Sequence, residues 1–258
     1  MAKPIELLGR HTLEVVSEFG RVARFAGDIV RNLFRPPVRF GRTVEAVFDL
    51  GVLSLVLIAT SGFAVGAVLG LQGYTTLVRF GAEQGLGAVV GLSLIRELGP
   101  VLTGLLVTGR AGSSVAAEIG SMVATEQLDG LRMMSVNPVH FVVLPKAVAM
   151  TLVMPLLSAI FIVCAIFGGY VVGVELLALD GGTYLSSLEE SVDFREDVLG
   201  SILKAWIFGM IIGLISTYRG YTSEPNAAGV SRATTSTVVI ASVTILFSDY
   251  FITALWGV

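Results

Sequence analysis

The sequence predicts an all-α integral membrane protein that crosses the membrane five times, and three observations support this fold class. Of its 258 residues, 54% are hydrophobic and only 14% are charged, whereas a soluble domain carries about 25% charged residues. Five apolar segments reach the length of about 20 residues that a helix needs to cross a bilayer. The 30 glycines suit membrane helices, because small residues let backbones approach closely.

The N-terminal region, residues 1–47, predicts an amphipathic helix that lies in the membrane interface. Its apolar residues recur at helical spacing, and these are Ile5, Leu8, Val15, Phe19, Val22, Ile29 and Leu33. Charged side chains fall largely on the other faces, and Pro36 with Pro37 ends the helix. A helix packed on a cytosolic partner would show the same pattern. The region lacks the apolar core and cleavage site of a signal peptide, so we expect no cleaved leader.

The five predicted spans lie in a membrane domain of residues 48–258. They cover residues 50–78, 85–109, 147–174, 198–218 and 233–257. Lys and Arg are concentrated in the N-terminal region and in the loops after spans two and four, which predicts that these face the cytoplasm. The loop of residues 175–197, on the other side, is strongly acidic. We therefore expect a cytoplasmic N-terminus and an external C-terminus.

Four charged residues fall inside these spans, namely Arg96, Glu97, Lys204 and Asp249. Each costs about 2.5–3.5 kcal/mol near the bilayer centre, so each needs a partner or a wet cavity. Counting along the helices places all four between the midplane and the outer surface. Lys204 and Asp249 can form a purely structural ion pair between spans four and five. Arg96 and Glu97 are neighbours on one helix and cannot face each other, which favours a polar cavity or a ligand.

Span one adds two features near its outer end. Gly62, Gly66 and Gly70 have the spacing of a close helix–helix contact, and packing explains them without any ligand. Gln72 and Tyr74 follow, and they either line the same cavity as the charged residues or lie at the membrane interface.

Residues 110–146 predict a long cytoplasmic loop that contains a short helix. Thr125 is the expected N-cap, with Glu126 and Asp129 in the first helical turn. One face of this helix would present Leu128, Leu131, Arg132 and Met134. A helix of this kind suits docking into the groove of a partner protein.

The sequence shows no catalytic motif of its own. It has no phosphate-binding GxxxxGK[ST] loop, no HExxH or CxxC pair and only two histidines, so we expect neither enzyme activity nor a metal site. Cys164 lies in an apolar run and predicts a packed thiol. Nothing in the sequence indicates nucleic-acid binding. A transporter of this kind would need a partner ATPase or an ion gradient as its energy source.

Several motifs occur in the order found in the MlaE-type permease family, which the chain resembles over roughly residues 48 to 257. They are residues 70–74 (GLQGY), 96–100 (RELGP), 109–113 (GRAGS), 117–120 (AEIG), 124–128 (ATEQL), 137–138 (NP) and 228–235 (AGVSRATT). The resemblance implies a homodimeric ABC permease in a bacterial inner membrane that moves phospholipid and maintains outer-membrane lipid asymmetry. It implies three kinds of partner: an ATPase dimer that binds ATP and magnesium, a STAS-domain protein and a periplasmic ring of MCE-domain subunits.

The resemblance also implies two sets of site residues. The substrate-binding set comprises Arg96, Glu97, Leu98, Gln72, Tyr74 and Phe80, to which the charge argument adds Lys204 and Asp249. The ATPase-coupling set comprises Glu118, Thr125, Glu126, Gln127, Leu128, Leu131 and Met134. Two other classes remain open from the residues alone. One is an ion-coupled secondary transporter with Glu97 and Asp249 as proton sites, and the other is a scaffold that anchors partners without transport.

Overall fold

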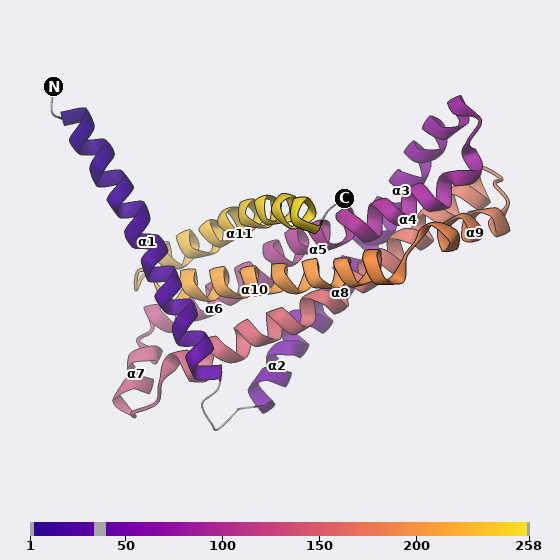
Figure 1. Cartoon of the computed structure of the whole chain (residues 1–258). Coiled ribbons are helices and arrows are strands. Elements are labelled where there is room, and N and C mark those ends of the chain that lie inside the picture. Colours follow the sequence, from indigo (N-terminus) through magenta and orange to yellow (C-terminus); the bar gives the residue numbers. More distant parts are fainter. Residues whose placement is uncertain (1–2, 34–39, 257–258) are drawn as a thin grey trace.

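The computed structural model describes residues 3–33 and 40–256, and within these ranges all regular structure is helical. The α-helices are α1 (Lys3–Leu33), α2 (Phe40–Gly51), α3 (Leu55–Leu77), α4 (Leu86–Ser93), α5 (Gly99–Val107), α6 (Ser113–Ala124), α7 (Gln127–Met133), α8 (Leu144–Tyr170), α9 (Gly181–Ser191), α10 (Leu199–Tyr221) and α11 (Ala227–Trp256). Figure 1 shows a bundle with α7 and the start of α2 at one end and α9 at the other. We call these the α7 end and the α9 end.

The prediction of five spans is confirmed, because five stretches of helix are long and apolar enough to cross a membrane. They are Phe40–Phe80, Glu83–Ala124, Val139–Leu176, Phe194–Tyr221 and Ala227–Leu255. The first begins at Phe40, after the predicted end of the N-terminal helix at Pro36 but inside the N-terminal region of residues 1–47. The third contains Cys164, whose thiol is partly buried.

The second span is much longer than predicted, and the predicted loop of residues 110–146 is correspondingly shorter. Its 42 residues would measure about 63 Å as a continuous helix, twice the thickness of the hydrocarbon core. The extra length is α6, which looked like a loop because its sequence is small and polar. Val115, Ala116 and Ile119 are nevertheless buried on one face of α6, which packs on α10 and α11.

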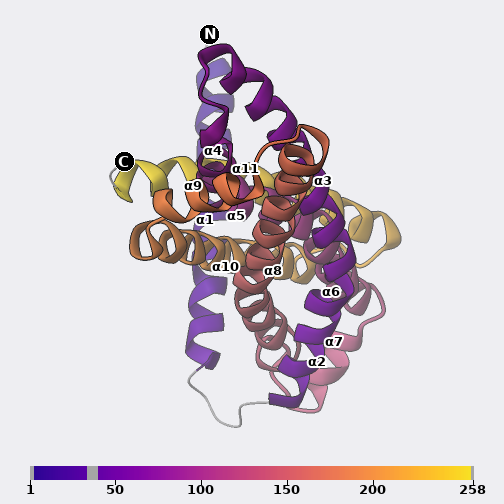
Figure 2. The same ribbon diagram turned by 90° about the vertical axis from the view of Figure 1, so that its right-hand side faces the viewer.

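Close approach between α3 and α8 builds the centre of the bundle, and the two helices lie side by side in Figure 2. A Cβ atom at Gly66 would lie 1.7 Å from the carbonyl oxygen of Ala165, and one at Gly62 would lie 2.6 Å from that of Phe161. The backbones can therefore touch only where glycine removes the side chain. This contact confirms the packing interpretation of the glycine series.

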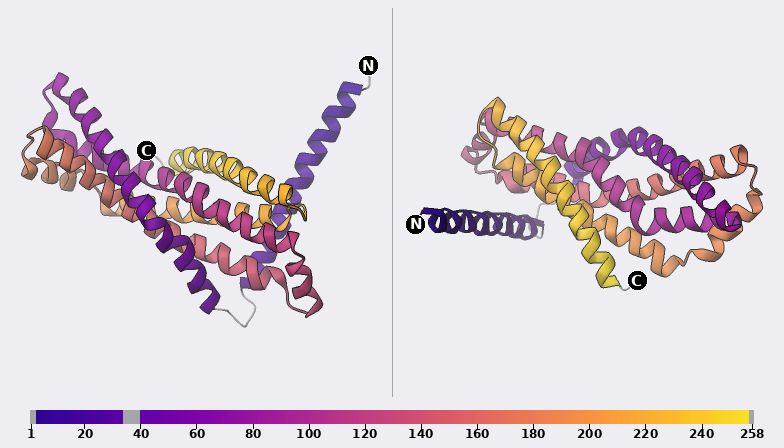
Figure 3. Two further views of the ribbon diagram at one scale, coloured as in Figure 1. Left: turned by 180° about the vertical axis from the view of Figure 1, so that it is seen from behind. Right: turned by 90° about the horizontal axis from the view of Figure 1, so that it is seen from above.

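Helix α1 crosses the α7 end of the bundle at a steep angle, whereas the five spans run along the bundle (Figure 1). Phe25 anchors it, with ring centroids 5.5 Å from those of Tyr218 and Tyr221 on α10. Both views of Figure 3 show its N-terminal end projecting away from the spans. Val16 and Phe19 are exposed, as an interfacial helix requires. The side chains of Ile5, Leu8 and Val15, which also supported that prediction, lie outside the described residues.

Two spans differ in the regularity of their backbones. The second contains two π-helical segments, Leu94–Leu98 and Thr108–Gly112, and each adds a residue to a helical turn. In contrast, α10 is one uninterrupted α-helix. It packs against α5, α6, α8 and α11, and Gly209 and Gly213 let it approach the backbone of α8.

Candidate functional site

A cluster of charged side chains lies inside the membrane domain, toward the α9 end. Span two supplies Arg96 and Glu97 from its first π-helical segment. Span four supplies Lys204, and α11 supplies Asp249. The wide π turn lets adjacent side chains of span two reach different helices. Because these groups come from three spans, any movement between the spans changes their distances.

Lys204 is the centre of this cluster. Its Nζ atom lies 2.9 Å from Oε1 of Glu97 and 3.5 Å from Oδ1 of Asp249. It also donates hydrogen bonds to the backbone oxygen of Arg96 at 2.9 Å and to Oγ1 of Thr253 at 2.8 Å. The hydroxyl of Thr253 donates in turn to Oε1 of Glu97 at 3.1 Å. With only 8% of its side chain exposed, the ammonium group depends on these partners rather than on water.

Arg96 pairs with a different carboxylate. Its Nε atom lies 2.6 Å from Oδ1 of Asp197, which is only 3% exposed. The other oxygen of Asp197 accepts a hydrogen bond from the backbone amide of Asp193 at 2.8 Å, so the aspartate is held from two sides. The Arg96 side chain remains 44% exposed in the single chain. It is therefore the cation of the cluster that is best placed to meet an additional anion.

The structure shows which of the four charged residues predicted within the spans pair with one another. Lys204 and Asp249 do approach each other, but Glu97 lies closer to Lys204 than Asp249 does. Arg96 and Glu97 do not pair with each other, as their adjacency predicted. The cluster holds two cations against three carboxylates, and Oδ1 of Asp249 has no hydrogen bond within the described part of the chain.

Sequence reasoning missed two members, Asp197 and Thr253. Asp197 was assigned to the acidic loop, one residue before the predicted span. Extending the predicted fourth helix by one residue would have included Asp197. It would then share a face with Lys204, because the two are seven positions apart. Thr253 follows Asp249 by one turn of α11 for the same reason.

The remaining predicted substrate residues lie elsewhere. Leu98 is partly buried and packs against the main hydrophobic core. Gln72 and Tyr74 belong to the last turns of α3, and Phe80 ends the short helical turn that follows. Among the described residues, the hydrogen bonds and ion pairs of the charged cluster include none of these three. Their part in substrate binding stays a prediction.

The short helix predicted between spans two and three exists as α7, but its start and its exposed face differ from the prediction. Thr125 ends α6, and its hydroxyl donates to the backbone oxygen of Ser121 at 2.8 Å. The N-cap position of α7 is Glu126, which adopts a left-handed conformation with φ 59°. This sharp turn separates α7 from α6, which a simple Thr cap could not have done. Asp129 lies in the first turn, as expected, and Gln127 begins the helix.

The leucines of α7 face the protein instead of a partner. Leu128 is buried and Leu131 is partly buried against the main core. The exposed surface carries Met133 and Met134, and Met133 is 84% exposed. Glu118 lies on α6, where it pairs with Lys146 at 2.6 Å. A methionine surface beside charged residues suits a partner protein, because methionine adapts its shape to many surfaces.

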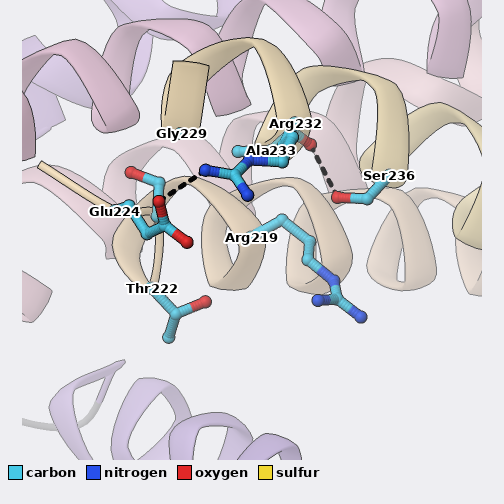
Figure 4. Close-up of a pocket in the computed structure, with 8 residues that line it drawn as sticks. Arg219, Thr222, Glu224, Gly229, Arg232, Ala233 and Ser236 are labelled. Atoms are coloured by element: carbon cyan, nitrogen blue, oxygen red, sulfur yellow. Dashed lines mark hydrogen bonds and ion pairs between the residues drawn. The ribbon is translucent and has the colours of Figure 1, made fainter. Parts of the chain in front are cut away.

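The connection between α10 and α11 also carries charge at the α7 end. A pocket of about 260 Å³ lies there, and Nη2 of Arg232 is 2.5 Å from Oε2 of Glu224. Figure 4 shows the two side chains pointing toward each other. Arg219 points away from this pair in the same view and lies 3.7 Å from Glu18 of α1. These contacts tie the last two spans and α1 together. Because Arg232 is already paired, we assign this pocket to the closure of the loop.

Five spans with a partly open cluster of charged residues among them are typical of membrane transporters. The chain matches the model of the family "Permease MlaE" over residues 43–255. It belongs to the MlaE permease family, which makes it a permease of the ABC transporter class.

Its relatives come from several lineages. A "Probable ABC transporter permease protein" of Rickettsia bellii is 43% identical over 96% of each chain. The "Intermembrane phospholipid transport system permease protein MlaE" of Haemophilus influenzae is 42% identical over 97% of this chain and 96% of its own. "Protein TRIGALACTOSYLDIACYLGLYCEROL 1, chloroplastic" of Arabidopsis thaliana is 32% identical over 89% of this chain and 65% of its own.

Proposed function

We propose that the chain is the permease subunit of an ABC transporter that moves phospholipids between a bacterial inner membrane and a periplasmic ring of MCE-domain subunits. This exchange would maintain the lipid asymmetry of the outer membrane. The observation that supports the proposal most strongly is the charged cluster, since its exposed Arg96 lies among apolar spans. A phospholipid needs both environments, a cation for its phosphate and apolar helices for its acyl chains.

In this mechanism the members of the cluster have distinct roles. The guanidinium of Arg96 binds the lipid phosphate, and Asp197 positions that guanidinium from behind. Lys204 is saturated with protein partners, so it holds Glu97, Asp249 and Thr253 together instead of binding the headgroup directly. The lipid leaves when movement of the spans brings Glu97 into competition with the phosphate for Arg96.

The proposed orientation places the N-terminus and the α7 end in the cytoplasm and the C-terminus in the periplasm, following the distribution of Lys and Arg. The α7 region then meets a cytoplasmic ATPase dimer, which binds ATP and magnesium, together with a STAS-domain protein. A second copy of this chain completes the permease. Support for the homodimer comes from α11, the least buried of the five spans, which exposes Val243, Phe247 and Phe251.

The test is ATP-dependent transfer of fluorescent phospholipid by the complete complex in vesicles. We expect Arg96→Gln to lower transfer at least tenfold, because its amide cannot replace a charged contact to phosphate. Arg195→Gln is the matched control, because Arg195 is an exposed arginine close to Asp197 in the chain. Normal transfer by Arg96→Gln would refute the assignment of the site, and transfer without ATP would favour an ion-coupled transporter.

A further inference from the structure

The proposed function leaves open how movement at α7 reaches the charged cluster, and the inference below rests on that function. The two regions lie at opposite ends of the spans. Two helical routes connect them. One runs back along the second span, from α6 to Arg96, and the other runs along α10 to Lys204.

The route along the second span is interrupted twice. The π-helical segment Thr108–Gly112 lies between α6 and Glu97. The second π-helical segment, Leu94–Leu98, contains Glu97 itself. A π turn has a different hydrogen-bond register from the α-helix on either side, and helices commonly bend at such turns. A displacement of α6 can therefore be absorbed before it reaches the cluster.

The route along α10 has no such interruption. Helix α10 is continuous from Leu199 to Tyr221, with Lys204 in its second turn. Lys204 and Tyr221 are separated by about 26 Å along the axis, at 1.5 Å per residue. A rigid helix of this length transmits an axial shift or rotation to its far end. Any such shift changes the distances from Lys204 to Glu97, Asp249 and Thr253 together.

Tyr221 joins α7 to this helix. Its ring packs against both hydrophobic clusters of the protein and lies 5.5 Å from the ring of Phe25. Its hydroxyl accepts a hydrogen bond from Nη2 of Arg132 at 2.7 Å. Arg132 is itself fixed within α7, because Nη1 lies 2.5 Å from Oδ1 of Asp129. The hydrogen bond with Tyr221 also raises the pKa of Arg132 above its usual value.

We infer that Tyr221 is a positioning residue for transport, through which movement of α7 is transmitted along α10 to Lys204. When α7 moves, the hydrogen bond from Arg132 moves the hydroxyl of Tyr221 with it. Because the ring of Tyr221 is packed, α10 moves together with the tyrosine. Leu128 and Leu131 hold α7 on the body of the protein, while the Arg132–Tyr221 contact attaches it specifically to α10.

The test uses the complete complex in vesicles and measures phospholipid transferred per ATP hydrolysed. Tyr221→Phe removes the hydroxyl and keeps the ring, so we expect normal assembly and ATP hydrolysis but a fivefold to tenfold lower ratio. Tyr218→Phe is the matched control, because its hydroxyl bonds Glu18 of α1 at 3.2 Å instead of α7. Arg132→Gln should lower the ratio similarly, and the double variant should be no worse than either single variant, as a shared contact requires.

An unchanged ratio in Tyr221→Phe would overturn the inference. So would an equal loss in Tyr218→Phe, because that result would mean that any change at this end of α10 disturbs transport. Additive losses in the double variant would show that Arg132 and Tyr221 act separately and would overturn it as well. If the unaltered complex transfers no lipid with ATP, the proposed function itself fails and the inference falls with it.

Discussion

The charged groups at the α9 end and at the α7 end are built in opposite ways. In the polar cluster, Lys204 and Asp197 are nearly inaccessible, and each has at least two partners. At the α7 end, the pairs Arg132–Asp129 and Arg232–Glu224 have more than half of every side chain exposed. Water can replace a partner at the α7 end but not at Lys204 or Asp197, whose side chains are 8% and 3% exposed. The cluster therefore fixes the relative positions of the spans, whereas the exposed pairs can break and form as helices move.

This difference has an energetic consequence that measurement can test. Removing one member of a buried ion pair costs about 3–5 kcal/mol, because the other charge is left without solvent or partner. Removing one member of an exposed pair costs about 0–1 kcal/mol. We compare matched residue types at the two ends, from the largest expected effect to the smallest.

The largest effect is expected from Lys204→Met. The substitution keeps an unbranched side chain but leaves Glu97 and Asp249 facing each other without their shared cation. We expect the free energy of unfolding of the purified permease to fall by about 3–5 kcal/mol. Thermal or denaturant unfolding in mild detergent measures this change.

Lys146→Met is the matched control for that measurement. The side chain of Lys146 is also largely buried, at 17% exposed, but its partner Glu118 is 56% exposed. Because water can solvate the carboxylate that Lys146→Met leaves behind, we expect a loss of about 1 kcal/mol. Equal losses for the two lysines would show that burial does not distinguish the two ends.

A smaller effect is expected from Asp197→Asn. The amide keeps the shape of the side chain but removes the charge opposite Arg96. Its NH₂ group, which can only donate, also takes the place of one of the two oxygens that accept from Arg96 and from the amide of Asp193. We expect a loss of about 2 kcal/mol in the same assay, since Arg96 retains some contact with solvent. Asp129→Asn, at the exposed end, should cost less than about 1 kcal/mol. A larger loss for Asp129→Asn than for Asp197→Asn would contradict the comparison.

The same contrast explains which parts of the molecule the sequence could predict. Apolar length alone predicts the five spans, because the bilayer imposes one dimension on every helix. Charges within those spans are costly, so the sequence predicts that four residues need partners or a polar cavity, namely Arg96, Glu97, Lys204 and Asp249. The partners are harder to predict, because the Arg96–Asp197 pair joins positions 101 residues apart and depends on how the spans pack.

The α7 end was less predictable for a different reason. Its polar residues obey no membrane constraint, so Thr125 and Glu126 could each begin the helix on local propensity alone. In the structure Glu126 is the N-cap and adopts a left-handed conformation, and Leu128 points toward the core. Tertiary packing of that leucine, which no local pattern reveals, decides the direction of the whole helix.

The smallest predicted effect concerns Glu18, whose side chain is 35% exposed, between the buried members of the cluster and the exposed pairs of the α7 end. Hydrogen bonding to Arg21 holds the pKa of Glu18 below its usual value of 4.5, although partial burial opposes this effect. Because the pKa is depressed in the folded state, the stability that Glu18 contributes, first through Arg21 of α1 and then through Arg219 and Tyr218 of α10, is complete above about pH 4.5 and is lost as the pH falls through the lower folded value.

We expect that contribution to be below about 1 kcal/mol, since a third of the side chain is exposed. Hydrogen exchange of the α1 amides between pH 6 and pH 3 measures it, after correction for the intrinsic pH dependence of exchange. Glu18→Gln should exchange faster at pH 6 and should lose the additional change at acidic pH. If Glu18→Gln keeps the same acid-induced opening as the unaltered protein, another group controls the attachment of α1.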